Sequence, residues 1–209
     1  MLSIKYFPYI GPSWRSDKTV VEINLNFEGD ESGGFPAEVS IVRAILIDNG
    51  ILAADETFPR QSLPQDRKSW CASLLAQTAL LFQQKSGHRV GFFNILTSSN
   101  PDRLIAVLEY EQGDVGITSV KLAYEFLSGQ RRMLAEPFRM FRQFARERLL
   151  PLDTGLIISV ARECDIPCFH LERLPFSREK FNQLTGGDCL RLNGLVMLGH
   201  GCLLYTSPS

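Results

Sequence analysis

The sequence predicts an α+β fold in which helices pack against an antiparallel sheet. The first observation is an alternation of apolar and polar residues from Val21 to Phe27, which is typical of a half-buried strand within 19–27. The second is a pair of apolar segments, 89–96 and 103–110, that flank a turn-forming stretch and predict a hairpin. The third is the helical spacing of apolar residues in segments between and after these strands.

Local signals place the first elements of this fold. Residues 2–7 predict a strand, and a helix opening at 35–46 should end at Asn49 and Gly50, since this pair is typical of a helix stop. Residues 51–65 contain prolines and show no clear period, so we expect an irregular connection there.

Two further helices are expected over 66–84 and 115–127. The first of them should stop at Gly87. Its helical spacing predicts that one side faces the core, and that side consists of Trp70, Leu74, Thr78 and Leu81.

The stretch 130–149 combines arginines with phenylalanines, and from Pro137 onward it predicts an amphipathic helix. Guanidinium groups match the geometry of carboxylates, so its arginines predict an anion-binding face. The alternative is that they only solvate a helix whose phenylalanines are core, and partial neutralisation by Glu136 and Glu147 favours this alternative. The candidate binding residues are the stripe Arg139, Arg142 and Arg146, supported by Arg131 and Arg132, and the phenylalanines are Phe138, Phe141 and Phe144.

A domain boundary is expected near 150–154, because a proline-containing turn leads into a new helix over 155–164. Asp153 or Thr154 is the predicted N-cap of that helix. The expected domains are therefore 1–149 and 150–201.

The segment after this helix predicts short strands. Residues 168–171 form the first, and Asn193-Gly194 predicts a hairpin turn that joins 190–192 to 195–198. Residues 202–209 look like translated adapter sequence, so we expect them to be a non-native tail.

Four short motifs resemble those of the cyanophycin synthetase family. They are Gly11-Pro-Ser-Trp14, Val107-Leu-Glu-Tyr-Glu111, Asp165-Ile-Pro167 and Leu195-Val-Met-Leu-Gly-His-Gly201. The resemblance covers about 1–201 in order. It implies an N-terminal domain followed by the first α/β elements of an ATP-grasp domain, in a chain truncated before the catalytic part.

The resemblance also implies a function for the full-length parent, an ATP-dependent carboxylate–amine ligase that uses ATP and Mg²⁺ to activate a carboxylate. Because the family places those groups later in the chain, this fragment is expected to hold no catalytic residue and no cofactor. Its expected role is to bind an amino-acid polymer or acidic peptide, or to support a homo-oligomer interface. The alternative is a free-standing, non-catalytic interaction domain.

Metal chemistry is not expected. In some members of the family one helix carries metal ligands, and the corresponding positions here are Ser73, Ala76 and Gln77, which cannot replace histidine and glutamate as zinc ligands. Cys164 and Cys168 form a lone pair without a partner pair, so reduced thiols are favoured over a zinc site.

Glu109 and Glu111 should point to the same face of a regular strand. A paired-carboxylate site is one interpretation. Because no acid–base partner lies within sequence reach, a solvated strand face is favoured.

Composition sets the remaining expectations. The net charge of −1 gives no argument for nucleic acid, and no apolar run of about 18 residues predicts a membrane span. The five cysteines are odd in number and unevenly spaced, which is typical of reduced thiols. Together with the lack of a secretory signal pattern, this predicts a cytoplasmic protein.

Overall fold

The computed structural model describes residues 2–9, 16, 18–27, 34–129, 133–164, 166, 168–170, 196–198 and 203–205. The chain divides into two compact units. The larger unit comprises Met1–Tyr9 and Val20–Leu149, and the smaller unit comprises Ile10–Thr19 and Leu150–Ser209.

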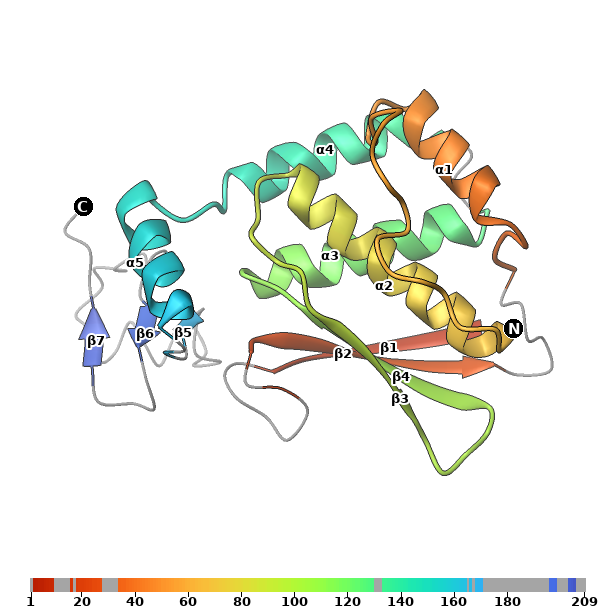
Figure 1. The fold of residues 1–209 in the computed structure, drawn as a ribbon, viewed down its shortest axis with the longest axis horizontal. Coiled ribbons are helices and arrows are strands. Elements are labelled where there is room, and N and C mark those ends of the chain that lie inside the picture. Colours follow the sequence, from red (N-terminus) through yellow and green to blue (C-terminus); the bar gives the residue numbers. More distant parts are fainter. Residues whose placement is uncertain are drawn as a thin grey trace, which may run out of the picture. The chain divides into compact units, whose positions relative to one another are not determined.

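A four-stranded antiparallel sheet forms one side of the larger unit and confirms the α+β prediction (Figure 1). The predicted hairpin is present, since β3 pairs with β4 and places Asn94 opposite Val107. β2 and β4 are distant in the sequence and pair in the middle of the sheet, with Ile23 opposite Ala106. The strands are β1 (Leu2–Tyr9), β2 (Val20–Phe27), β3 (Phe93–Thr97) and β4 (Arg103–Glu109), in the order β1-β2-β4-β3.

β2 is buried along almost its whole length, rather than half-buried as its alternating sequence predicts. It lies between β1 and β4, and its polar residues Glu22 and Asn24 are each only 6% exposed. The Glu22 carboxylate accepts hydrogen bonds from Asn24 Nδ2 at 2.8 Å and from the Tyr9 hydroxyl at 3.4 Å. These bonds offset the cost of burying polar groups in a central strand.

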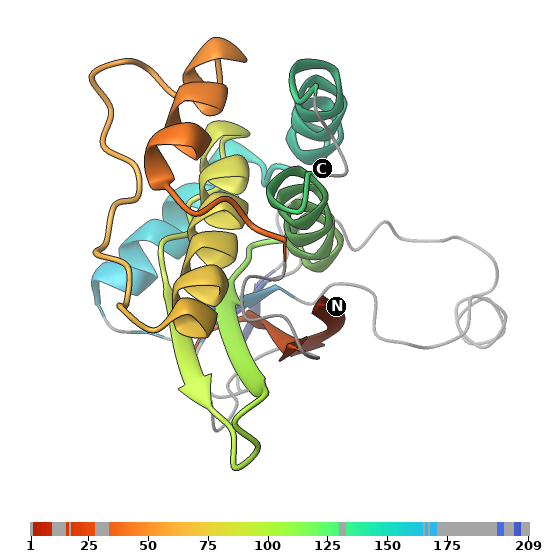
Figure 2. The same ribbon diagram turned by 90° about the vertical axis from the view of Figure 1, so that its right-hand side faces the viewer.

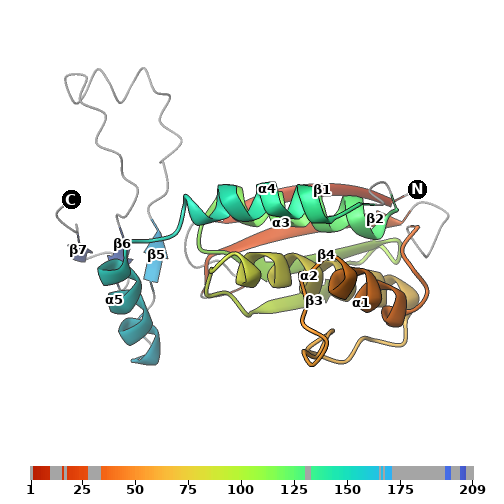
Figure 3. The ribbon, with the colours of Figure 1, turned by 90° about the horizontal axis from the view of Figure 1, so that it is seen from above.

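Four helices cover one face of this sheet in two layers. α2 contacts β3 and β4, whereas α3 contacts β1 and β2, so these two helices lie directly on the sheet. α4 contacts both α2 and α3 and runs along α3 in the view from above, and α1 and α4 lie farther from the sheet (Figures 2 and 3). The helices are α1 (Val39–Asp48), α2 (Arg67–Lys85), α3 (Gly113–Leu127) and α4 (Ala135–Arg146).

α2 begins and ends close to its predicted bounds, but it is buried on all sides. The Asp66 carboxylate caps its first turn by accepting a hydrogen bond from the Ser69 amide at 2.8 Å, and Gly87 follows its end with φ of +103°. Residues 71–83 are all buried. The burial therefore extends beyond the side that the helical spacing predicts, because α2 lies between the sheet, α3 and α4.

The smaller unit contains a helix and a three-stranded antiparallel sheet with the order β5-β6-β7. Its helix begins at Leu152, directly after Pro151, whose carbonyl accepts a hydrogen bond from the Gly155 amide at 2.9 Å. The predicted N-cap at Asp153 or Thr154 is therefore wrong, since both residues already lie inside the helix. The elements are α5 (Leu152–Glu163), β5 (Cys168–His170), β6 (Val196–Leu198) and β7 (Leu203–Tyr205).

Some predicted segments lie partly or wholly outside the residues that the structure describes. The loop at 11–14 and the predicted strand at 190–192 lie outside them. β7 falls within 202–209, the segment expected to be a non-native tail, and pairs with β6. Within the described ranges, no helix combines the length and apolar character needed to cross a membrane.

Candidate functional site

Phenylalanine side chains fix the orientation of α4 on the larger unit. Phe138 and Phe141 are 6% and 4% exposed, and Ala145 is fully buried one turn later. The ring centroid of Phe82 on α2 lies 5.3 Å from that of Phe138 and 6.4 Å from that of Phe141. Tilted aromatic pairs at these distances stabilise the contact beyond the burial of their area. Because one stripe of α4 is held in this way, its opposite face points away from α2.

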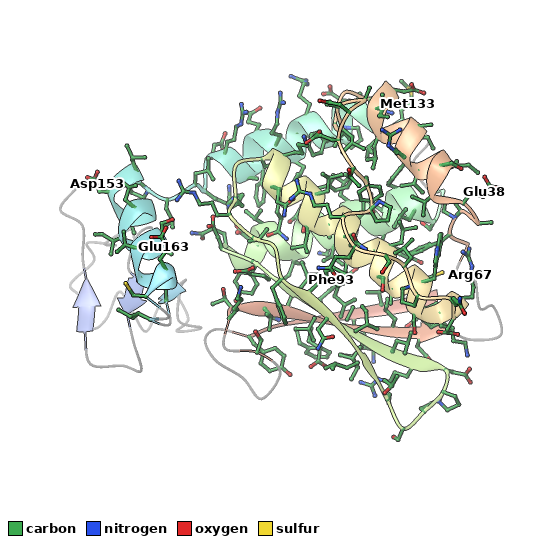
Figure 4. All side chains as sticks on the ribbon, viewed as in Figure 1. Glu38, Arg67, Phe93, Met133, Asp153 and Glu163 are labelled. Atoms are coloured by element: carbon green, nitrogen blue, oxygen red, sulfur yellow. The ribbon has the colours of Figure 1, made fainter. Side chains whose placement is uncertain are left out.

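Three predicted binding residues lie together on that outward side, and we call Arg139, Arg142 and Arg146 the arginine face. All three are exposed, and with Gln143 and Glu147 they line a shallow, open depression. Figure 4 shows side chains that end in nitrogen projecting from α4 on the side away from the sheet. The structure therefore brings together three of the five candidates. The other two, Arg131 and Arg132, lie outside the described residues.

Arg139 is engaged within its own helix. Its guanidinium donates two hydrogen bonds to Glu136, from Nε to Oε2 at 2.8 Å and from Nη2 to Oε1 at 2.6 Å. This pairing holds the pKa of the Glu136 carboxyl below its ordinary value and raises the pKa of Arg139. The side chains are 62% and 67% exposed, so solvent screens their attraction. An incoming carboxylate therefore competes with Glu136 for this arginine.

Arg142 and Arg146 differ from Arg139 in their partners. Neither guanidinium has a hydrogen bond or ion pair with any described residue. The nearby Glu147 carboxylate instead accepts a hydrogen bond from Gln143 Nε2 at 3.2 Å. Two guanidiniums four residues apart on a helix are neighbours on its surface, so they can meet carboxylates of one ligand together.

Arg148, just beyond α4, has a structural role instead. Its guanidinium carbon lies 3.7 Å from the centroid of the half-buried Phe144 ring, and its Nη1 donates to the Phe144 carbonyl at 3.1 Å. Its Nε donates to the Asp114 carboxylate at 2.6 Å, in the first turn of α3. Arg148 therefore links the end of α4 to the start of α3 and is not part of the arginine face.

The expectation that Glu109 and Glu111 form a solvated strand face is wrong. They are only 3% and 6% exposed. Glu109 Oε2 accepts hydrogen bonds from the amides of Gly91 and Phe92 at 2.9 and 3.0 Å. Glu111 instead contacts His88, at 3.1 Å between its Oε2 and the ring Nδ1. The two carboxylates therefore engage different partners, and each has a role inside the fold.

His88 is the partner that sequence reasoning missed. It lies 23 positions from Glu111 and 57 from Ala145, whose carbonyl oxygen is 3.1 Å from the ring Nε2. The only local signal is its place directly after the helix stop Gly87. Its partners come from the segment just after β4 and from α4, so only the assembled tertiary structure identifies them.

The helix positions tied to metal binding in the resembled family lie inside α2. Ser73, Ala76 and Gln77 are 3%, 0% and 6% exposed. The Gln77 side chain exchanges hydrogen bonds with the main chain of Gln61, at 3.0 and 3.2 Å. Hydroxyl, methyl and amide groups replace the nitrogen and carboxylate ligands that zinc prefers.

The remaining ligand types give no metal site in the described part of the chain. No group of three or more histidine, cysteine, aspartate or glutamate side chains is placed to hold a metal ion there. Cys71 is buried, Cys164 is exposed and Cys168 is half-buried, and all three are free thiols.

Comparisons with family models and with curated protein sequences assign no relationship. No family model matches the chain, and no curated protein sequence matches it. The geometry of the arginine face therefore carries the functional argument.

Proposed function

We propose that the larger unit binds an acidic amino-acid polymer or acidic peptide on the arginine face of α4. The observation that supports this is the exposure of Arg139, Arg142 and Arg146 on one side of a helix whose opposite side is fixed by buried phenylalanines. The helix that presents the face is thus packed against the core, and a preorganised element limits the entropy lost on binding. Guanidinium groups favour carboxylates through paired hydrogen bonds.

Binding of this kind depends on repetition. Each exposed ion pair contributes about 0.2–1 kcal/mol, so a ligand with a single carboxylate binds weakly. A polymer that repeats the carboxylate engages several guanidiniums in succession, and each later contact forms at a high effective concentration. Because these contacts are exposed, the affinity should fall steeply as the salt concentration rises.

We further propose that the domain belongs to an ATP-dependent carboxylate–amine ligase similar to cyanophycin synthetases. The support is the order of the four motifs along 1–201, and the domain would hold the growing polymer for a catalytic region that binds ATP and Mg²⁺. A cytoplasmic, homo-oligomeric parent is part of this proposal. Sequencing the coding region beyond residue 201 tests it, since glycine-rich and Mg²⁺-binding segments are required there.

A free-standing interaction domain is the second candidate. It is favoured by the composition of the depression, because the arginine and glutamine side chains that form most of its lining are neither nucleophiles nor general bases at neutral pH. Both candidates require the same binding face, so one experiment tests that face for both.

The test is retention of the protein on immobilised poly-aspartate. Replacing Arg142→Glu together with Arg146→Glu should reduce affinity about 5- to 30-fold, since two exposed contacts are lost and repulsion is added. The matched control is Lys5→Glu with Arg60→Glu, two exposed positions that are not part of α4 and give the same change in charge. Equal retention of the two double variants, both folded by circular dichroism, would show that net charge alone governs binding.

A further inference from the structure

β3 is an outer strand of the four-stranded sheet, and alternate residues of it direct their main-chain groups away from β4. In an antiparallel pair, every second residue exchanges hydrogen bonds with the neighbouring strand, and the residues between them face the other way. The Glu109 amide donates to the Phe92 carbonyl at 2.9 Å, and Asn94 lies opposite Val107 two positions farther along. The residues whose main-chain groups point outward are therefore Phe93, Ile95 and Thr97. Among the described residues, their amides have no hydrogen-bond partner.

The other outer strand, β1, is protected against pairing with a further strand. The Phe27 amide donates to the Asp102 carbonyl at 2.9 Å, and the registers that continue from this bond place the main-chain groups of Pro8 on the outer side of β1. A proline offers no amide hydrogen there, and the exposed Lys5 adds a charge, so both residues discourage edge pairing. β3 contains neither a proline nor a charged residue. The two edges of the sheet therefore differ, and only β3 is an unprotected template.

The apolar side chains of β3 are incompletely covered on both faces of the sheet. Phe93 and Ile95 are half-buried and pack against the main core on the helix-covered face. Leu96 is half-buried on the opposite face, where it packs against a small cluster with Ile105 and Val107. Cross-strand neighbours contact each other on both faces of a sheet, so an added strand would cover what remains exposed of these side chains.

We propose that β3 pairs with β3 of a second copy of this chain, antiparallel and centred on Ile95, so that the two sheets join in a two-fold dimer. The outward groups fit this occupant because they are symmetric about Ile95. Phe93 lies opposite Thr97 of the second copy and Ile95 opposite its own counterpart, so each outward amide meets a carbonyl. A charged residue near a two-fold axis would meet its like charge, and β3 has none.

The symmetry of this pairing places the helices of both copies on one side. The two-fold axis of an antiparallel strand pair runs perpendicular to the sheet, so the helix-covered faces of the two copies form one continuous face. The paired segment is short, because β3 has only five residues. A stable dimer buries a larger interface than one short strand pair, so association should be weak and should depend on protein concentration.

One consequence of the dimer rests on the proposed function. α4 lies on the helix-covered side, and its arginine face is directed away from the sheet (Figure 4). The two copies therefore present both arginine faces on the same side, where one acidic polymer can engage them together at a high effective concentration. The pairing of β3 itself depends only on the strand register, so it does not require that the arginine face binds a ligand.

The test combines analytical ultracentrifugation of the whole chain at several concentrations with hydrogen exchange of the sheet amides. The dimer predicts that the amides of Phe93, Ile95 and Thr97 exchange more slowly as the concentration rises. The Asn94 amide is directed toward β4 and should exchange at the same rate throughout. The outward amide of Tyr6 on β1 should remain fast at every concentration.

Variants of exposed positions on β3 test the interface without altering the core. Thr97→Pro removes an outward donor in each copy and should weaken dimerisation about tenfold or more, since two hydrogen bonds are lost across the axis. Thr97→Val keeps the amide hydrogen and should dimerise like the wild type. Asn94→Lys with Thr97→Lys adds charge to the edge and should also dissociate the dimer. Its matched control, Ser3→Lys with Ser40→Lys, adds the same charge at exposed positions outside β3 and should not.

The outcomes separate the dimer from the proposed function. A chain that stays monomeric at high concentration, unchanged dimerisation in Thr97→Pro, or a dimer whose outward β3 amides remain fast overturns the inference. Slow exchange of these amides in a monomer also overturns it, because another segment would then pair with the edge. If Thr97→Pro does not fold, the two charge variants decide. A dimer that depends on β3, together with arginine variants that retain poly-aspartate, supports the interface and contradicts the proposed function.

Discussion

At the scale of single residues, the burial of two carboxylates is where the structure departs most from the sequence-based prediction. Glu109 and Glu111 were expected on a solvated face, because alternation tells which residues share a face but not what covers it. What covers them comes from distant segments, the amides of Gly91 and Phe92 and the ring of His88. Local sequence contains no signal for contacts of this range, so their burial could not be predicted.

The role of Glu109 gives a prediction at this scale. Glu109→Ala should lower the free energy of unfolding by about 1–3 kcal/mol, because two main-chain amides would lose their acceptor in a buried site. Glu109→Gln keeps an acceptor oxygen and should lose less. Urea denaturation at pH 7 measures both variants. Stability equal to wild type in Glu109→Ala would mean that these amides find other acceptors.

At the scale of elements, α4 was the most predictable part of the candidate site. The spacing of Phe138, Phe141 and the three arginines predicted one buried and one exposed face, and the structure shows both. The sequence predicted that Glu136 partly neutralises the arginine charge, but it did not predict the two hydrogen bonds between Arg139 and Glu136. α2 was predicted well in its bounds but not in its burial, because nothing local shows that another helix layer lies above it.

The contact between Arg139 and Glu136 gives a prediction for this element. Glu136→Gln should strengthen retention on poly-aspartate about two- to fivefold, because it removes the carboxylate that occupies Arg139. A matched control is Glu147→Gln, since Glu147 contacts Gln143 rather than an arginine. Its effect should be smaller, because the substitution lowers the negative charge of the depression without releasing an arginine. Equal gains in the two variants would mean that Arg139 takes no specific part.

At the scale of the whole molecule, the sequence predicted the fold class and most elements but not the strand order. Turn signals placed β3 and β4 as a hairpin, because their pairing is local. The pairing of β2 with β4 joins residues about 80 positions apart, Asn24 with Ile105 for example, and depends on how the helices pack. The stacking of two helix layers on the sheet depends on similarly distant contacts.

The larger unit should fold without the rest of the chain, and truncation tests where this folding unit ends. A chain that ends at Leu149 keeps the contact between Leu149 and Gly87 and should unfold cooperatively. A chain that ends at Leu134 lacks α4 and exposes Phe82, so it should unfold at lower urea concentration. Limited proteolysis of the full chain should leave a resistant core that ends near residue 150. A resistant core that ends well before α4 would contradict this account.

The most direct measurement of the central claim is a titration of the isotope-labelled chain with poly-aspartate, followed by the ¹⁵N signals of the arginine side chains. The account predicts that the signals of Arg142 and Arg146 shift at low ligand concentration, and that the signal of Arg139 shifts at higher concentration as Glu136 is displaced. At high salt, the ligand should no longer shift any of the three signals. Arg148, which is paired with Asp114, should not shift. Shifts spread over the surface, or none on α4, would contradict the claim that this helix is a binding face.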